Sequence, residues 1–248
     1  MTLSSFIRYP VLLLILLAAI LCSSAYGQKK SKGKKKSKTM SVGFQIKPIF
    51  RNQFFTGGNV GEVQNQVEFK IEPRLGFAGG MVVRRDFGKQ WAFESGINYV
   101  RRNYRISVND LDSTYAEQAI FSIVQYEIPL SWLIYVRLGD NLYMNNSLGL
   151  SLNMFKRSEV GKSDSFDYEF FRSTWLIPGL VANLGFEYRM KSAGAIYLGA
   201  SYQLPFSRII TVEIDYYHNK GVESFSERMG LSYFTVDLKY FLPIKNEK

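Results

Sequence analysis

Cysteine, histidine and long apolar runs are almost missing from this sequence. Of its 248 residues, one is cysteine (Cys22) and one is histidine (His218). A single cysteine forms no internal disulfide and cannot build a cysteine-based metal site. No apolar run reaches the ~18 residues expected of a membrane-spanning helix. These absences exclude disulfide-stapled scaffolds, zinc-cysteine modules and proteins anchored by transmembrane helices.

Motifs for catalysis or cofactor binding are equally sparse. The glycine pairs at 57–58 and 79–80 lack the lysine and following helix of a phosphate loop. His218 lies near Glu223 and Ser224, residue types that hydrolases combine, but this polar stretch fixes no geometry and offers no oxyanion hole. Isolated loop carboxylates supply fewer than the six or more oxygens that calcium needs. We therefore predict a protein that is not an enzyme and has no catalytic residue, cofactor or metal ligand.

Positive charge is concentrated near the N-terminus. The whole chain carries a formal charge of +10, but Arg8 and the seven lysines between 29 and 38 supply +8 of it, with no acid before residue 39. The remainder, at +2, is close to neutral. A nucleic-acid-binding domain carries its basic residues on a folded face, so the sequence predicts no nucleic-acid partner.

The N-terminal residues explain where that charge lies. Residues 1–27 combine one positive charge, the apolar run VLLLILLAAIL, and Ala25 and Gly27 at positions −3 and −1 of a cut before Gln28. This pattern is typical of a secretory signal peptide. We predict a signal peptide at 1–27, a lysine-rich periplasmic tail at 28–39 and a barrel domain at 40–248. The lysines of the tail are Lys29, Lys30, Lys32, Lys34, Lys35, Lys36 and Lys38. The tail is either a soluble spacer or a segment that attracts anionic lipid headgroups or acidic cell-wall groups.

From residue 40 onward the apolar residues alternate with period two. In LYMNNSLGLSLNMF (142–155), for example, Leu148, Leu150 and Leu152 share one face and small or polar residues the other. Such alternation predicts β-strands. We expect eight strands, at 41–51, 75–86, 90–106, 121–136, 142–155, 174–189, 194–206 and 228–241. They exceed the typical soluble length of about 5–6 residues and cover the 9–11 that a tilted transmembrane strand needs.

The connections alternate between short and long. Short turns at 87–90, 138–141 and 190–194 alternate with long polar links at 52–74, 107–120, 156–173 and 207–227. This rhythm favours an all-β fold, an eight-stranded antiparallel up-and-down transmembrane β-barrel in an outer membrane. Its short turns and both termini would lie in the periplasm, and its four long links would be extracellular loops. Insertion would require outer-membrane lipids and the barrel-assembly machinery.

Period two alone does not decide which face points inward, so a soluble periplasmic ligand-binding barrel of lipocalin type stays open. Small residues and amides are frequent on the polar faces, which suits a tight polar lumen better than a wet exterior. Aromatic residues at predicted strand ends, such as Trp91, Tyr104, Phe121 and Phe155, suggest membrane-interface girdles. Eight strands leave room inside only for side chains. The charged residues predicted to share a polar lumen network are Lys47, Glu94, Glu127, Glu187, Asp237 and Lys239.

One strand resembles a known family. Tyr126, Ile128, Pro129 and Leu130 in YEIPLSW follow the aromatic, apolar and Pro-Leu pattern of porin-family, PorT-like outer-membrane proteins, and the hairpin at 79–102 is similar to theirs. The resemblance extends in architecture over 40–244. It implies outer-membrane residence and, for PorT itself, a part in type IX protein secretion.

Two function classes follow. The first is a non-enzymatic outer-membrane scaffold or interaction protein, acting through its long loops around a side-chain-filled lumen. The second is a transport or type IX secretion component.

Overall fold

The computed structural model describes residues 40–50, 60–113, 115–156, 159–172, 174–190, 192–207, 210–218 and 221–243, and these contain 14 strands. The strands are β1 (Met40–Phe50), β2 (Val60–Gln64), β3 (Val67–Pro73), β4 (Gly76–Asp86), β5 (Trp91–Asp110), β6 (Tyr115–Arg137), β7 (Leu142–Phe155), β8 (Glu159–Lys162), β9 (Phe166–Arg172), β10 (Leu176–Met190), β11 (Gly194–Pro205), β12 (Ile210–His218), β13 (Gly221–Met229) and β14 (Tyr233–Phe241). No helix within these residues is long and apolar enough to cross a membrane. The all-β prediction is confirmed, whereas the count of eight strands is not, because the described residues alone contain 14.

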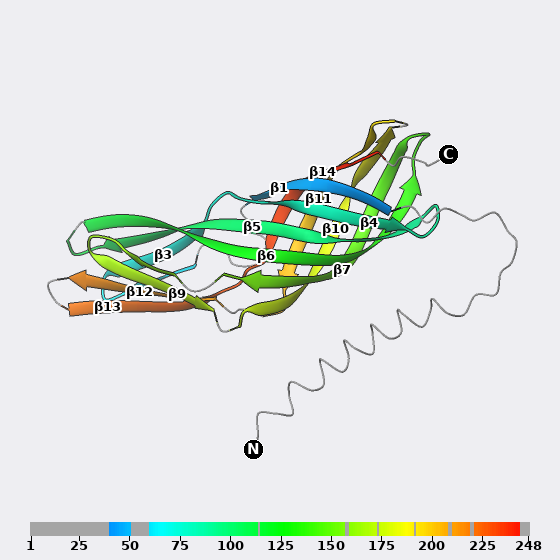
Figure 1. Cartoon of the computed structure of the whole chain (residues 1–248). Coiled ribbons are helices and arrows are strands. Elements are labelled where there is room, and N and C mark those ends of the chain that lie inside the picture. Colours follow the sequence, from blue (N-terminus) through cyan, green and yellow to red (C-terminus); the bar gives the residue numbers. More distant parts are fainter. Residues whose placement is uncertain are drawn as a thin grey trace, which may run out of the picture. The chain divides into compact units, whose positions relative to one another are not determined.

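A closed ring of antiparallel pairings forms the barrel (Figure 1). It runs through β1, β4, β5, β6, β7, β10, β11 and β14 and returns to β1. Each strand pairs with the ring member before and after it in the chain, which is an up-and-down order. The first residue of β1 and the last residue of β14 lie at the end of the barrel that carries the short turns. Met40 pairs with Arg85, just before one short turn, and Phe241 pairs with Ala195, just after another.

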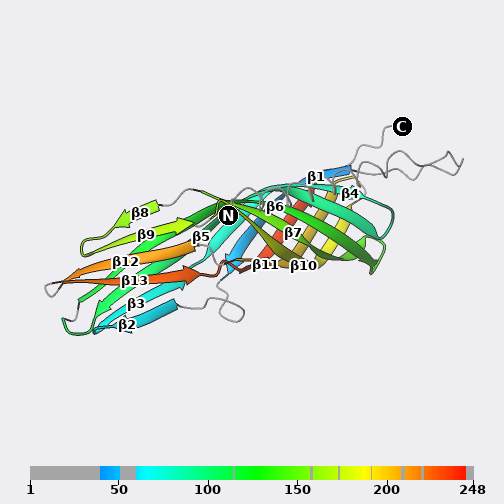
Figure 2. The ribbon, with the colours of Figure 1, turned by 90° about the horizontal axis from the view of Figure 1, so that it is seen from below.

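The other six strands occupy the links that were expected to be loops, so this part of the sequence interpretation is wrong. β5 and β6 continue past the ring, and β3 and then β2 add to the extended part of β5. A separate sheet has the order β13-β12-β9-β8. Figure 2 shows this sheet and β2–β3 at the same end of the ring. We call these six strands, with residues 104–110 of β5 and 115–123 of β6, the cap.

The cap has its own hydrophobic core. One cluster of buried side chains joins its two sheets, and the Phe69 and Phe225 rings stack at 5.4 Å across them. Tyr104, Phe121 and Phe155, expected in an interfacial girdle, are buried in this cluster instead. Burying such side chains is worth about 1.5–3 kcal/mol each, which explains why the links fold into sheets.

The carboxylate of Glu117 is a second contact between the two sheets of the cap. Glu117 on β6 accepts hydrogen bonds from the hydroxyls of Tyr115 and Ser163 and from the backbone N–H groups of Asp164, at 3.1 Å, and Ser165, at 3.3 Å. Because Ser163, Asp164 and Ser165 form the turn between β8 and β9, Glu117 joins the two cap sheets.

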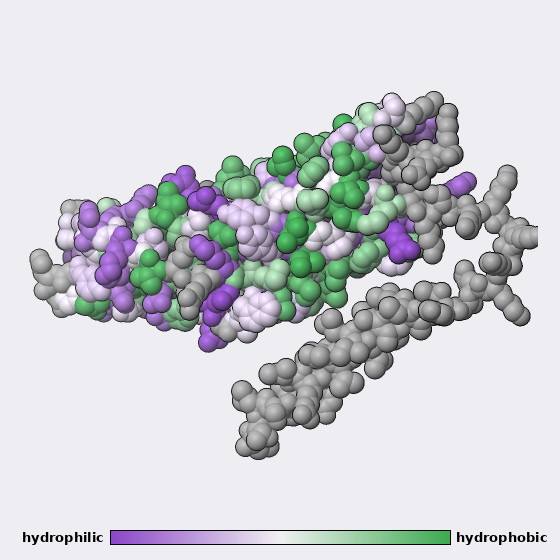
Figure 3. Space-filling view, viewed as in Figure 1, coloured by the Kyte–Doolittle hydropathy of each residue, from purple (hydrophilic) through white to green (hydrophobic). Residues whose placement is uncertain are grey.

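The barrel wall is apolar outside and polar inside. Leu148, Leu184 and Leu198 are more than half exposed, whereas the polar residues on the opposite faces of the strands are buried. The space-filling view shows apolar side chains gathered over the barrel strands (Figure 3). A water-soluble barrel would have the reverse arrangement. The apolar exterior therefore resolves the ambiguity that period two leaves open.

The apolar exterior also has the height of a bilayer. On the part of β6 that pairs with β7 in the ring, the exposed apolar positions run from Tyr126 to Val136. Ten residue steps of about 3.3 Å, tilted by about 40°, span ~25 Å, the height of a transmembrane barrel's apolar band. Trp132 contacts Phe87 and Trp91 toward the short-turn end of this band, and Tyr126 contacts Tyr99 at its other end.

Candidate functional site: the polar barrel interior

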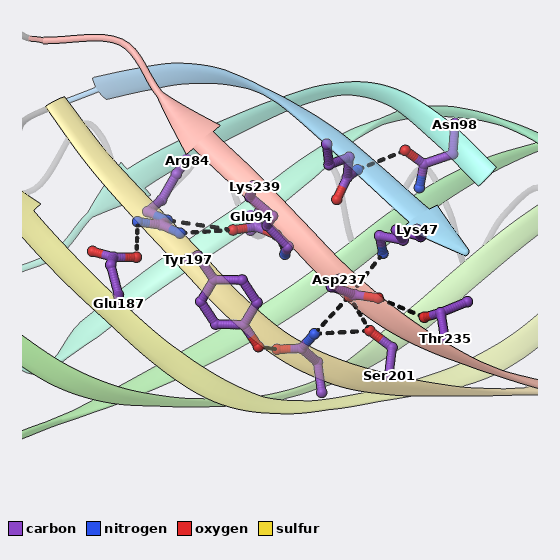
Figure 4. Close-up of polar contacts among 12 residues, drawn as sticks. Lys47, Arg84, Glu94, Asn98, Glu187, Tyr197, Ser201, Thr235, Asp237 and Lys239 are labelled. Carbon is purple, nitrogen blue, oxygen red and sulfur yellow. Dashed lines mark hydrogen bonds and ion pairs between the residues drawn. The ribbon is translucent and has the colours of Figure 1, made fainter. Parts of the chain in front are cut away.

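The six charged residues predicted for the lumen are all buried, each with no more than 7% of its surface exposed. They come from β1, β5, β6, β10 and β14, and period-two alternation turns each of them inward. Figure 4 shows five of them converging within the ring. The structure connects the six in three groups through other polar side chains.

The first group is a chain of ion pairs. Lys239 donates to Glu94, and Glu94 accepts from Arg84 Nη2 at 3.2 Å. Arg84 Nη1 in turn reaches Glu187 at 2.7 Å (Figure 4). Glu187 also accepts from Arg189 Nε at 2.7 Å. The Arg84 guanidinium stacks 3.6 Å from the Phe241 ring centroid, so this chain is held by packing as well as charge.

The second group surrounds Asp237. Lys47 Nζ lies 3.3 Å from its carboxylate, Asn183 donates to it at 2.9 Å, and the Ser201 hydroxyl also donates to it. The Tyr197 hydroxyl donates to Asn183 on the same side of the barrel. A Cβ at Gly199 would collide with this hydroxyl. Glycine at that position therefore makes room for a large ring inside the barrel.

The third group contains Glu127. Its carboxylate accepts from Asn98 Nδ2 at 3.1 Å and from the Tyr233 hydroxyl. Asn98 in turn accepts from Gln45 Nε2 at 2.6 Å. Glu127 is thus held by neutral donors, and no cation of the described residues lies within ion-pair distance of it.

Sequence reasoning missed two buried arginines, Arg84 and Arg102. The missed signal is alternation, because Arg84 has the same parity as the buried Ala78 and Val82 of β4, but the glycines in that strand obscure the two faces. With them, the buried charged residues in the described part of the chain are four cations and four anions. The cations are Lys47, Arg84, Arg102 and Lys239, and the anions are Glu94, Glu127, Glu187 and Asp237. Equal numbers of positive and negative charges allow most of them to be paired, which offsets the desolvation cost of burying them in a narrow lumen.

The remaining candidates from the sequence are not brought into one site. Ser224 Oγ donates to Asp215 Oδ1 at 2.6 Å, and Glu223 accepts from Asn65 at 3.1 Å. The side chain of His218 and the basic tail, Lys29 to Lys38, lie outside the described residues. Within the described ranges, His, Cys, Asp and Glu form no group of three or more suited to a metal ion.

Comparison with known proteins gives one decisive match. A family model described as "Outer membrane protein beta-barrel domain" matches residues 28–221. No curated protein matches the chain. Two solved structures share 10% identity with it: the β domain of the Bordetella autotransporter BrkA (TM-score 0.32, covering 81% of this chain and 97% of that one) and the translocator domain of the autotransporter NalP from Neisseria meningitidis (TM-score 0.33, covering 97% and 98%).

Proposed function

The chain belongs to the family of outer membrane protein β-barrel domains, and from this premise we propose that it is a closed, non-enzymatic barrel presenting the cap as an interaction surface. The eight-stranded ring spans the membrane. The cap, rather than a set of flexible loops, is the part that meets a partner.

The observation that supports closure is the charge-balanced, hydrogen-bonded set of side chains in the lumen. Three polar groups cross the interior from opposite strands, and each buried charge is hydrogen-bonded. An eight-stranded ring leaves interior space only for side chains. An ion crossing it would have to displace bonded side chains, for example Arg84 from Glu187 at 2.7 Å, which costs several kcal/mol per buried pair.

The cap supports a role in interaction because it is a folded body with a core of its own. Surfaces held by a packed core lose little conformational freedom when they bind a partner. We place the short turns and both ends of the ring in the periplasm, and the cap outside the cell, as in other barrels of this architecture. Cysteine labelling with a membrane-impermeant reagent tests this orientation. Val222→Cys in the cap should react on whole cells, and Gly139→Cys in a short turn should not.

Conductance in planar bilayers tests closure. The purified protein should give no stable channel at any applied voltage at which the bilayer survives. A variant with Arg84, Tyr197 and Lys239 all changed to alanine is the positive control, because it empties the middle of the lumen. Both proteins are first shown to be folded by their migration on an unboiled gel. Stable, reproducible conductance of the unaltered protein would refute closure.

A second candidate role is a part in transport or type IX secretion. The feature that favours it is the PorT-like strand at 126–132, which forms barrel wall with Tyr126 outward and Pro129 inward. A secretion defect in a deletion strain, rescued by the full-length gene and not by one lacking the cap strands, would favour this role. Crosslinked partners on the cap with normal secretion would favour the interaction role.

Export and insertion complete the proposal. Residues 1–27 direct export, the barrel-assembly machinery inserts the ring, and the lysine tail at 28–39 attracts anionic lipid headgroups or acidic cell-wall groups in the periplasm. Mass determination of the mature N-terminus tests the cleavage before Gln28.

A further inference from the structure

A small cavity of about 30 Å³ lies where the barrel meets the cap. It is bordered by the end of β1, the β3–β4 connection, β5 and the segment between β13 and β14. Ten residues line it: Ile49, Phe50, Pro73, Arg74, Arg102, Asn103, Tyr104, Gly230, Ser232 and Tyr233. Two of the ten are arginines and none is acidic, so the lining itself carries positive charge and no negative charge.

Two buried polar atoms of this lining have no hydrogen-bond partner among the residues that the structure describes. They are Arg102 Nε and Ser232 Oγ. Arg102 is 3% exposed, and an arginine nitrogen can only donate. A buried polar group without a partner costs about 1–3 kcal/mol, and more when it is charged. Two such donors beside one cavity indicate an acceptor that occupies it.

The bonds that Arg102 does make go to neutral groups. Its Nη1 donates to the Leu231 carbonyl and its Nη2 to Gln125 Oε1, both at 2.7 Å. The nearest link to a carboxylate is indirect, since the Arg102 guanidinium lies 5.3 Å from the Tyr233 ring, whose hydroxyl donates to Glu127. Every other buried cation of the lumen contacts a carboxylate directly.

We propose that this cavity binds a small monovalent inorganic anion of the halide class, held by Arg102 Nε, Ser232 Oγ and the Arg74 guanidinium. The volume accommodates one or two water-sized particles, which suits a single halide and excludes a phosphate-bearing headgroup. Arg74 also lines an adjoining surface pocket with Glu72, Leu75 and Arg105. That pocket gives the anion a route from solvent.

The anion would fasten the cap to the barrel. Leu231 belongs to the cap core and also accepts the Arg102 hydrogen bond. An acceptor between Arg102 and Ser232 therefore links the β13–β14 segment to the wall of β5. Halide binding should raise the stability of this junction rather than that of the barrel as a whole.

Bromide is the direct probe. Crystals of the full mature protein are grown in sodium bromide, and anomalous scattering is collected at the bromine edge. We expect an anomalous peak within hydrogen-bond distance of Arg102 Nε and Ser232 Oγ. Density without anomalous signal would mean that water fills the cavity, and this would overturn the proposal.

Protection of the β13–β14 segment from proteolysis gives a solution test. At constant ionic strength, chloride or bromide should slow cleavage near residue 230 relative to gluconate, which is too large for the cavity. Ser232→Ala removes a donor that has no partner within the described residues, so it should fold normally and bind halide about ten-fold more weakly. Ser226→Ala, on the exposed face of β13, is the matched control and should keep the halide effect. Equal protection in chloride and gluconate, or an unchanged halide effect in Ser232→Ala, would refute the site.

Discussion

Replacing Glu94 with glutamine removes the carboxylate that joins two lumen cations. Glu94 accepts from Lys239 and, at 3.2 Å, from Arg84. In the Glu94→Gln protein Arg84 keeps Glu187 at 2.7 Å, but Lys239 loses the carboxylate it pairs with and keeps the Tyr197 ring, 5.1 Å away. The perturbation therefore leaves one buried lysine unpaired.

Breaking a buried ion pair in this way costs about 3–5 kcal/mol. The neutral glutamine still accepts a hydrogen bond, so we expect a loss of about 3 kcal/mol, at the lower end of that range. Adding Lys239→Met removes the unpaired charge, and the double variant should be more stable than Glu94→Gln alone. This recovery distinguishes an electrostatic role from a simple packing defect.

The assay is equilibrium urea unfolding in lipid vesicles, followed by tryptophan fluorescence and by the folded band on unboiled gels. Asp140→Asn is the matched control, because it breaks the Arg137–Asp140 pair at an exposed short turn. Such a pair contributes little. If Glu94→Gln unfolds at the same urea concentration as this control, the lumen network does not stabilise the barrel.

Three further predictions concern the cap and the tail. Phe69→Ala removes the ring that stacks on Phe225 and should destabilise the cap by about 3–5 kcal/mol; trypsin should then cut the cap while the unboiled barrel band persists, and an undigested cap would contradict its core. Burial raises the pKa of Glu117, but hydrogen bonds from Ser163 and Tyr115 outweigh it and leave the pKa below its ordinary value of 4.5. Because the folded-state pKa is lowered, this stabilisation is present above pH 4.5 and is lost as the pH falls through the folded-state value. Protease sensitivity of the β8–β9 turn should therefore rise in acid, and Glu117→Gln should be sensitive at every pH. Deleting residues 29–38 should weaken binding to anionic vesicles at low salt, by up to about 1 kcal/mol per lysine; unchanged binding would leave the tail a spacer.

The barrel strands could be located from the sequence because their two faces differ so strongly. The expected ranges at 142–155, 41–51 and 194–206 lie within one residue of β7, β1 and β11 at both ends. An apolar face for lipid and a small or polar face for the lumen impose a long, regular alternation. The orientation of those faces needed the structure, because period two is the same for a barrel and its inverse.

The cap was missed for a physical reason. Its strands are short, and their outer faces carry charged residues, so that Val67, Phe69 and Ile71 alternate with Glu68, Lys70 and Glu72. The same alternation appears in Ile210, Val212 and Ile214 of β12. Each run alone cannot bury its apolar face, and only pairing between distant segments creates the core. The many charged residues of these segments suggested polar loops, whereas the alternation of apolar and charged residues indicated strands.

Cell fractionation, with the outer-membrane fraction run on a gel unboiled and boiled, is the decisive test of a membrane barrel. The protein should be enriched in the outer-membrane fraction and should shift in apparent size on boiling, because the closed ring resists detergent until it is heated. Recovery in the soluble periplasm, with no shift on boiling, would contradict a membrane barrel with an apolar exterior and a polar, filled interior.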